Sequence, residues 1–304
     1  MRRVTAAPRR PDIAADGAER GQAVLDELVA LLDLDRTGPD TFTGVSPESR
    51  QFRVYGGQVA GQALVAAGRT VAPGRSVHSL HSYFIRGGDP RTPIEYRTER
   101  IRDGRSFTTR RVLAVQGGEA IFMLSASFQE PQEGLVHAEP APADVPAPES
   151  LPDLGSRRAA GHGGDWLGRA ERPIDIRFVD EPVWTADRVA TQQPIRAWLR
   201  ADGTLSDDPL LHACLLTWAS DMMLLSSVVA RHDMSATAVQ LASLDHAMWF
   251  HAPFRADEWL LYECWSPAAS GGRGLATGRF FTRAGTMIAS TAQEGLVRLP
   301  RHDT

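Results

Sequence analysis

The sequence repeats itself, and this repeat restricts the possible folds more than any other feature. Two stretches of similar length each contain an apolar helix pattern followed by four strand patterns. The helix patterns are GGQVAGQALVAAGRTV at residues 56–71 and PLLHACLLTWASDMMLLSSVVA at residues 209–230. The second is apolar on nearly every side, which predicts burial over most of its surface.

Two dipeptides give the spacing of the repeat. A Ser-Leu pair that begins at Ser79 recurs at Ser243, and a Gln-Glu pair that begins at Gln129 recurs at Gln293. Both pairs recur after 164 residues. Two anchors with one common separation indicate a tandem duplication.

Eight segments have the alternating pattern of half-buried strands, and turn signals such as Asp103-Gly104 and Gly117-Gly118 separate them. No helix pattern lies between consecutive strands, so the pattern predicts antiparallel sheets and not a β-α-β array. The predicted strands are 77–85, 93–101, 106–115 and 119–128 in the first half, and 239–250, 258–266, 275–283 and 286–299 in the second.

A long helix followed by an antiparallel meander that wraps around it is the hotdog architecture. We therefore expect an α+β double hotdog, with an N-terminal unit at residues 20–134 and a C-terminal unit at residues 174–304. Residues 135–173, rich in Pro, Ala and Gly, predict an inter-domain linker. Residues 1–19 predict a disordered tail, and the apolar spacing at residues 24–32 predicts an amphipathic helix of about three turns.

Composition excludes several classes of function. The chain has no lysine and no asparagine, so all 33 basic residues are arginine. This excludes Schiff-base chemistry, a phosphate loop ending in Gly-Lys-Ser/Thr, N-glycosylation and a catalytic asparagine. A net charge of -4 gives no electrostatic case for binding nucleic acid.

The sequence also predicts where the protein works. Cys214 and Cys264 are the only cysteines, which favours a reducing compartment over a disulfide scaffold. No apolar run reaches the ~18–20 residues of a membrane span. The N-terminal segment lacks the apolar core of a secretory signal, and the C-terminal tetrapeptide is not a peroxisomal address. We therefore expect a cytoplasmic protein with no membrane span.

The motifs resemble one known family in order and in detail. A resemblance to the acyl-CoA thioesterase II family is carried in the first half by YGGQVAGQALVAA, VHSLHSYFIRGGDP, RDGRSFTTRRV and MLSASFQ. In the second half it is carried by TWASDMMLL, LDHAMWFHAPF, EWLLYECWSPAASGGRG and ASTAQEGLVR. The resemblance covers roughly residues 20–134 and 180–298. It implies a double-hotdog enzyme of fatty acid metabolism that hydrolyses acyl-CoA to a free acid and CoA, and that forms a homodimer or homotetramer.

The same resemblance implies a catalytic group of Asp221, Ser243 and Gln293, where relatives often carry Thr in place of the serine. Asp221 lies in an otherwise apolar helix, so burial would raise its pKa and make it a better base for water near neutral pH. Ser243 and Gln293 can hold that water by hydrogen bonds. The group lacks a His base, which favours attack by water, although the serine keeps a covalent route open.

Four further residues are candidates for binding the substrate. Gly57 and Gln58 open the first helix pattern, where free N–H groups and the positive end of the helix dipole suit a thioester oxyanion. A glycine pair needed only for tight packing is the alternative. Arg273 in GGRG, or Arg105 in DGRSF, could bind the phosphates of CoA, and a solvated turn residue is the alternative for each.

The first half lacks part of the predicted site. It has no acid between residues 56 and 71, and His81 takes the place of Asp245 in the repeat. We therefore expect one working site per chain. His78 and His81 are three apart on a strand and should project to opposite faces, so we expect no metal site and no cofactor.

Two other functions are compatible with a hotdog fold. A hydratase acting on acyl-CoA would need a segment containing asparagine, which this chain lacks. A non-catalytic acyl-CoA binding module is disfavoured because Asp221, Ser243 and Gln293 are all present. Five apolar residues could line an acyl tunnel, although they suit a plain core equally well: Met222, Met223, Leu224, Trp249 and Phe250.

Overall fold

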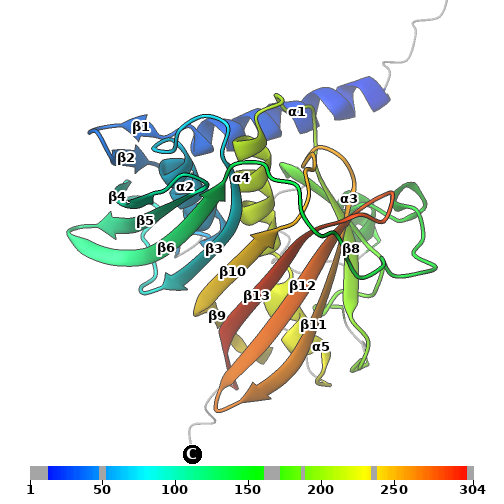
Figure 1. Ribbon diagram of the computed structural model, residues 1–304. Helices are drawn as coiled ribbons and strands as arrows, with labels where there is room; N and C mark the ends of the chain where they lie inside the picture. The colour runs from blue at the N-terminus through cyan, green and yellow to red at the C-terminus, as the bar shows by residue number, and fades with distance from the viewer. Residues whose placement is uncertain (1–12, 48–52, 161–171, 186–188, 234–237, 300–304) are drawn as a thin grey trace, which may run out of the picture.

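The computed structural model describes residues 13–47, 53–160, 172–185, 189–233 and 238–299 (Figure 1). Within these ranges, the strands form one antiparallel sheet whose inner face packs against the helices. The first half contains α1 (Ile13–Leu32), β1 (Asp35–Arg36), β2 (Thr41–Gly44), α2 (Gly56–Gly68), β3 (Ser76–Phe84), β4 (Ile94–Asp103), β5 (Phe107–Gln116) and β6 (Glu119–Gln129). The second half contains β7 (Ile174–Phe178), β8 (Ile195–Ala201), α4 (Pro209–Ser220), α5 (Leu224–Ala230), β9 (Gln240–Ser243), β10 (Asp245–Phe250), β11 (Leu260–Ser270), β12 (Arg273–Thr282) and β13 (Met287–Arg298).

The two halves have the same arrangement, which confirms the predicted double hotdog. In each half a strand precedes the long helix and a meander of strands follows it. The sheet runs β1-β2-β4-β5-β6-β3-β10-β13-β12-β11-β8-β7, with β9 also paired to β13. The halves join where β3 pairs antiparallel with β10, with Ser82 opposite His246. Figure 1 shows this junction at the centre of the sheet.

The helices α2 and α4 pack against each other in opposite directions, and glycines allow their close approach. A Cβ atom on Gly57 would lie 2.3 Å from the backbone oxygen of Trp218, and one on Gly61 would lie 3.2 Å from that of Cys214. At the other end of α2, Gly68 faces the side chain of Leu210. The N-terminus of α2 therefore lies beside the C-terminus of α4.

The predicted helix at 209–230 is interrupted after Ser220. The hydroxyl of Tyr262 donates to the carbonyl oxygen of Ser220 at 3.0 Å, so this oxygen is satisfied from outside the helix. Residue Asp221 is the C-cap of α4, and α5 starts at Leu224. The expectation that no apolar run reaches the length of a membrane span was wrong, because residues 209–230 have that length and composition, but 72% of their most apolar window is buried inside the protein.

Three other boundaries differ from the sequence-based expectation. The predicted strand at 239–250 is split at Leu244 into β9 and β10. The helix α1 begins at Ile13, inside the segment 1–19 that was expected to be disordered, while residues 1–12 lie outside the described ranges. The strands β1, β2, β7 and β8 were missed, although β7 has the alternating pattern IDIRF.

The segment predicted as a linker, 135–173, packs against the second half. The indole N–H of Trp198 donates to the carbonyl oxygen of Pro146 at 2.9 Å, and Glu149 pairs with Arg283 at 2.6 Å. It also contains a 3-10 turn (Pro148–Ser150) and the short helix α3 (Leu154–Ala159). The described part of this segment thus covers a small apolar cluster around Trp198. Residues 161–171 lie outside the described ranges.

The strand pairing contradicts one of the two predicted repeat anchors, the match between Gln129 and Gln293. In the first half Tyr83 lies opposite Met123, and 164 residues later Ala247 lies opposite Ala292. Since Ala292 follows Met123 by 169 residues, the last strand is shifted by five positions relative to the others. Gln293 therefore takes the structural place of Leu124 and not, as the dipeptide spacing predicted, that of Gln129.

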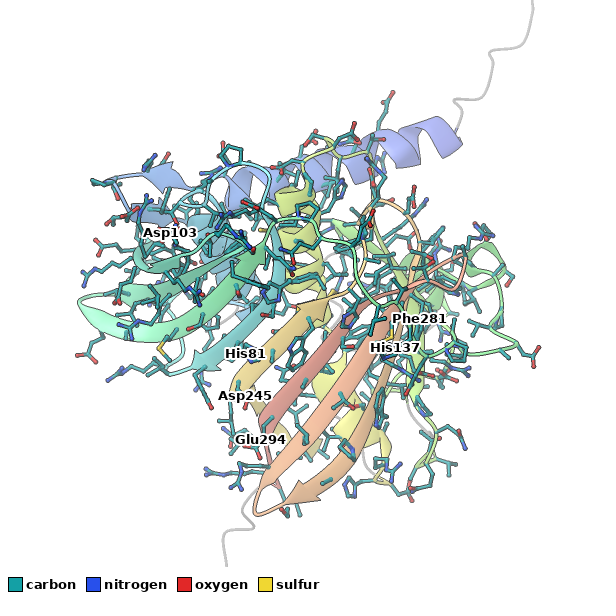
Figure 2. All side chains as sticks on the ribbon, in the orientation of Figure 1. His81, Asp103, His137, Asp245, Phe281 and Glu294 are labelled. Atoms are coloured by element: carbon teal, nitrogen blue, oxygen red, sulfur yellow. The ribbon has the colours of Figure 1, made fainter. Side chains whose placement is uncertain are left out.

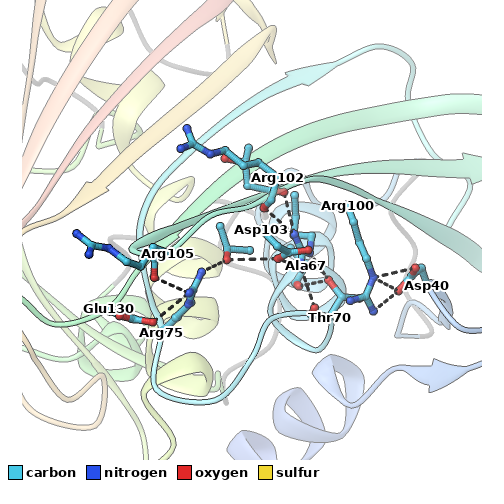
Figure 3. Close-up of polar contacts among 12 residues, drawn as sticks. Asp40, Ala67, Thr70, Arg75, Arg100, Arg102, Asp103, Arg105 and Glu130 are labelled. Carbon is cyan, nitrogen blue, oxygen red and sulfur yellow. Dashed lines mark hydrogen bonds and ion pairs between the residues drawn. The ribbon is translucent and has the colours of Figure 1, made fainter.

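A buried arginine on the sheet forms hydrogen bonds with the segment that follows the C-terminus of α2 (Figure 3). Arg110 on β5 is 1% exposed and donates to the hydroxyl and the carbonyl oxygen of Thr70 at 2.9 and 3.0 Å, and to Asp103 at 2.6 Å. Arg75 donates to the carbonyl oxygen of Arg105 at 2.8 Å, while the Arg105 side chain points away from this network (Figure 3). These contacts lie at the end of α2 that is remote from α4's C-terminus.

Candidate active site

Three polar side chains from three elements meet beside the interruption between α4 and α5. The amide nitrogen Nε2 of Gln293 on β13 donates to Oδ1 of Asp221 at 2.7 Å and to Oγ of Ser243 at 2.6 Å. The hydroxyl of Ser243, the last residue of β9, donates to Asp221 Oδ1 at 3.3 Å. The structure thus brings together the three residues that the family resemblance implied as a catalytic group.

The Asp221 carboxyl has the properties of a base that works near neutral pH. Burial raises its pKa from 3.8 to about 6, while hydrogen bonds from Gln293, the Gly57 backbone and Ser243 oppose that rise. The residue as a whole is partly exposed, whereas the carboxyl group itself is desolvated. A carboxyl group with a pKa close to the working pH is ionised often enough to accept a proton and basic enough to do so efficiently.

The first half of the chain completes this site through the N-terminus of α2. A Cβ atom on Gly56 would lie 2.7 Å from Asp221 Oδ2, and the backbone N–H of Gly57 donates to the same carboxylate. The helical ladder starts with Val59, whose N–H donates to the carbonyl oxygen of Tyr55, so the amides of residues 56–58 precede it. The Gly57 N–H was predicted to bind an oxyanion. It already donates to the Asp221 carboxylate, so an oxyanion would have to share this donor with Asp221.

The Gln58 side chain does not reach this group. Its Nε2 donates to the carbonyl oxygen of Val45 at 3.1 Å and to Ser46 Oγ at 3.0 Å. Only its backbone amide, in the first turn of α2, remains a candidate for binding substrate. The guanidinium of Arg273 pairs with Glu294 at 3.1 Å and is half exposed, so a CoA phosphate would have to compete with this carboxylate.

Sequence reasoning missed Tyr55, the N-cap of α2. Its hydroxyl donates to the carbonyl oxygen of Trp218 at 2.9 Å, and the two rings meet edge to face at 5.0 Å. Burial and the charge of Asp221 raise the pKa of Tyr55 well above its ordinary value. Its position directly before the glycine pair was the signal that could have identified it.

Sequence reasoning also missed Ser220 and His246, which lie behind the group. The hydroxyl of Ser220 and Nε2 of His246 are 2.8 Å apart, and both side chains are buried. Asp245 precedes His246 on β10 and, unlike His246, is only partly buried. Asp245 accepts a hydrogen bond from the Glu294 backbone at 2.7 Å, and Figure 2 shows these two residues on neighbouring strands.

The two histidines considered as a metal pair do not face opposite sides as predicted. A bulge between Val77 and Ser79 changes the alternation of β3. As a result His78 bonds Ser127 Oγ at 2.8 Å, and His81 packs edge to face on Trp249, both on the outer face of the sheet. Within the described ranges, no group of three or more His, Cys, Asp and Glu side chains is placed to hold a metal ion.

The proposed acyl tunnel does not form as one surface. Trp249 points to the outer face and is 37% exposed, whereas Met223 and Leu224 are buried in the core. Phe250 stacks on Phe254 at the inner side of β10. A pocket near α5 is lined by Met223, Ser226, residues 180–184 and the ends of β7 and β8, but it does not include Asp221.

The first half lacks the polar residues of this site at the matching positions. Arg69 is the C-cap of α2, where Asp221 is the C-cap of α4. Leu124 lies opposite Ser82, in the place where the second half has Gln293 beside His246. This arrangement is consistent with the expectation of one working site per chain.

Comparisons with known proteins agree over most of the chain. The family model described as acyl-CoA thioesterase matches residues 169–296, and the one described as acyl-CoA thioesterase N-terminal domain matches residues 46–129. The chain is 40% identical to acyl-coenzyme A thioesterase 8 of Mus musculus, over 90% of this chain and 89% of that protein. It is 34% identical to acyl-CoA thioesterase 2 of Haemophilus influenzae, over 90% of this chain and 98% of that protein. A solved structure of the acyl-CoA thioesterase II TesB2 from Mycobacterium marinum is 43% identical, with a TM-score of 0.75, and covers 90% of this chain and 98% of that one.

Proposed function

The chain belongs to the acyl-CoA thioesterase family and hydrolyses acyl-CoA to a free acid and CoA, and we propose that Asp221, Ser243 and Gln293 carry out this reaction. The observation that supports this proposal is their convergence, at 2.6 to 3.3 Å, around a carboxyl group whose pKa is raised to about 6. A buried base with a perturbed pKa and oriented partners is what hydrolysis by water requires.

In the proposed mechanism the Asp221 carboxylate accepts a proton from a water molecule as that water attacks the thioester carbonyl carbon. The C=O electrons move to oxygen, and amides at the start of α2 stabilise the resulting negative charge. When the carbonyl reforms, the C–S bond breaks and the electron pair leaves with sulfur. The protonated Asp221 then returns its proton to the CoA thiolate, which balances the reaction.

We favour attack by water over a covalent serine intermediate because of how Ser243 is bonded. Its oxygen accepts a hydrogen bond from Gln293, and its proton is directed at Asp221. The 3.3 Å separation of Ser243 Oγ from Asp221 Oδ1 is long for a base that activates a serine. An oxygen that accepts from an amide is also a weaker nucleophile, whereas the same hydroxyl is well placed to hold a water beside the carboxylate. If Ser243 were acylated, a burst of CoA release and a mass increase on the serine-containing peptide would appear in the first turnover.

The experiment that tests the proposal measures CoA thiol release from a panel of short, medium, long, branched and aromatic acyl-CoAs. The Asp221→Asn and Gln293→Leu variants should lose kcat by roughly 100-fold or more, the scale of general-base catalysis. Ser243→Thr should keep most of the activity because it retains the hydroxyl, whereas Ser243→Ala should not. Full activity in Asp221→Asn would show that the base is another group. Binding of acyl-CoA without turnover for any acyl chain would favour the alternative of a non-catalytic binding module.

We further propose that the chain self-associates as a homodimer or homotetramer through the outer face of the sheet near the β3–β10 junction. The support is the exposure there of large apolar side chains, with Tyr83 58% and Trp249 37% exposed. Light scattering coupled to size exclusion should give a dimer or tetramer mass, and Trp249→Glu should lower it. A monomeric wild type would contradict this proposal.

We propose that the protein works in the cytoplasm, in fatty acid metabolism. The support for the cytoplasm is that the only two cysteines, Cys214 and Cys264, are free and form no disulfide. The support for fatty acid metabolism is the acyl-CoA substrate. Cell fractionation followed by immunodetection tests the location.

A further inference from the structure

Behind the proposed catalytic group lies a polar side chain with an unusual environment, His246 on β10. It is 1% exposed, and its Nε2 lies 2.8 Å from Ser220 Oγ. Its other ring nitrogen, Nδ1, is buried and does not complete a hydrogen bond of ordinary geometry. A buried nitrogen in this state is costly unless a partner lies close by.

The amide oxygen of Gln293 is the candidate partner, because its side chain interacts with His246. Oε1 of Gln293 is also buried and also lacks a complete hydrogen bond. Ala247 lies opposite Ala292, so the next residues along the two strands, His246 and Gln293, are cross-strand neighbours facing the helices. Burial lowers the pKa of His246 to about 4, and an interaction with the Gln293 side chain opposes this shift. The two side chains therefore interact, although neither His246 Nδ1 nor Gln293 Oε1 has a hydrogen-bond partner of ordinary geometry.

We infer that His246 is a positioning residue, which holds the Gln293 amide with Nε2 toward Asp221 and Ser243 by donating from Nδ1 to Oε1. This inference rests on the proposed function of Asp221, Ser243 and Gln293. The reason is the geometry of the amide, whose two ends differ only in N and O. If the amide turned over, Oε1 would face the Asp221 carboxylate across 2.7 Å, acceptor against acceptor.

Ser220 decides which nitrogen of His246 carries the proton. When the Ser220 hydroxyl donates to Nε2, the neutral ring carries its proton on Nδ1 and can donate to Gln293. The alternative is that Ser220 donates to the carbonyl oxygen of Thr217 at 2.9 Å, which would leave Nδ1 as a bare acceptor against Oε1. Only the first arrangement gives Nδ1 a proton that can be donated to Gln293 Oε1, the two atoms that otherwise lack partners.

The duplicated half provides an internal comparison. Its strands β3 and β6 pair in the same way, and there the positions of His246 and Gln293 are occupied by Ser82 and Leu124. The half without the carboxylate thus also lacks both the amide and the imidazole. A histidine needed only to fill the interior of a hotdog unit would not have to be accompanied by the glutamine.

The test uses two variants that each keep one nitrogen of the ring. In His246→Asn the amide nitrogen takes the place of Nδ1 and can still donate to Gln293, whereas in His246→Gln it takes the place of Nε2 and keeps only the contact with Ser220. We expect His246→Gln to lose kcat by roughly 10- to 100-fold with little change in KM, the scale on which a misplaced catalytic group acts, and His246→Asn to retain most of kcat. Equal kcat values in the two variants, or a loss confined to KM, would overturn the inference.

A second readout separates positioning from simple destabilisation. Because the hydrogen bond from Gln293 lowers the pKa of Asp221, loosening that amide should move the apparent pKa in the kcat/KM profile of His246→Gln upward. The control is His212→Asn, which alters another buried histidine whose Nδ1 accepts from the Ala256 backbone at 3.1 Å, and it should leave kcat and the profile unchanged. An unshifted profile in His246→Gln, at matched thermal stability, would contradict the positioning role.

The failure of this inference can be told apart from failure of the proposed function. If Asp221→Asn is inactive while both His246 variants behave as the wild type, only the positioning role is wrong. If Asp221→Asn is active, the proposed base is wrong. Nitrogen-15 NMR of histidine in the wild type provides a test independent of variants that might fold poorly. The signal that changes in Ser220→Ala should show a proton on Nδ1, and a proton on Nε2 would refute the inference.

Discussion

Replacing Asp221 by asparagine should inactivate the enzyme and, above pH 6, make its fold more stable. Burial holds the pKa of this carboxyl at about 6 instead of 3.8, so the folded protein resists its ionisation. Two pKa units at about 1.4 kcal/mol each correspond to ~3 kcal/mol of folding free energy lost by the wild type when the carboxyl is ionised. Two effects reduce the gain in the free energy of unfolding of the variant to about 1–3 kcal/mol. Asp221 is partly exposed, and the side-chain amide of the introduced asparagine would face the Gly57 N–H.

The sign of this effect depends on pH, which makes the prediction specific. Below the ordinary pKa of 3.8 the carboxyl is protonated in both the folded and the unfolded chain, so the wild type carries no penalty. The penalty grows as the pH rises from 3.8 and is complete above about 6. Asp221→Asn should therefore match the wild type near pH 3 and exceed it near pH 8, as measured by urea unfolding at a series of pH values.

Asp257 provides a matched control, for which the pH dependence of stability has the opposite sign. At Asp257, burial acts to raise the pKa, but hydrogen bonds from Arg255 and the Leu205 backbone outweigh it, and the pKa is lowered. Asp257→Asn should therefore cost stability at neutral pH and cost less as the pH falls through the ordinary value. If the difference in stability between Asp221→Asn and the wild type stays constant across this pH range, the carboxyl is not desolvated and the reasoning about its basicity is refuted.

Three further predictions follow from the site and its supports. The kcat/KM profile should rise with pH through an apparent pKa near 6, because the ionised form of Asp221 is the base, and a flat profile between about pH 5 and pH 8 would argue against it. Gly57→Ala should destabilise the fold by about 1–3 kcal/mol in thermal or urea unfolding, because its Cβ would lie 2.3 Å from a backbone oxygen, whereas Gly134→Ala, with nothing within 4 Å, should have no effect. Arg110→Met should cost about 2–4 kcal/mol by leaving the Thr70 carbonyl oxygen unsatisfied, yet preserve kcat because it lies at the far end of α2.

The sequence was sufficient for the parts of the fold that depend on periodicity. The strands from β3 to β6 lie within two residues of the predicted ranges, because each alternates and ends at a turn signal. The interruption of the second long helix was not predictable, since it depends on Tyr262, a residue from a distant strand, taking the Ser220 carbonyl. The register of the last strand was misread because repeated dipeptides report sequence spacing, whereas pairing is set by bulges and loop lengths.

Some residues of the site could be predicted from the family resemblance, and others could be identified only in the structure. The meeting of Asp221, Ser243 and Gln293 came from family resemblance, and their spacing in the sequence alone would not have grouped them. The positions of Ser220 and His246 required the structure, because the split of the strand at Leu244 lets both Ser243 and His246 face inward although they are three residues apart. The ion pair between Arg273 and Glu294 was also not predictable, since nothing in the sequence assigns Glu294 to Arg273.

The junction between β3 and β10 has a consequence for how the chain acquires activity during folding. Its hydrogen bonds join residues more than 160 positions apart, so we expect it to close after the local hairpins of each half have formed. Each half can form its own helix and meander first, from contacts that are short in sequence. The amide of Gly57 reaches Asp221 only when the halves have docked, so recovery of thioesterase activity during refolding reports the last step, after recovery of secondary structure.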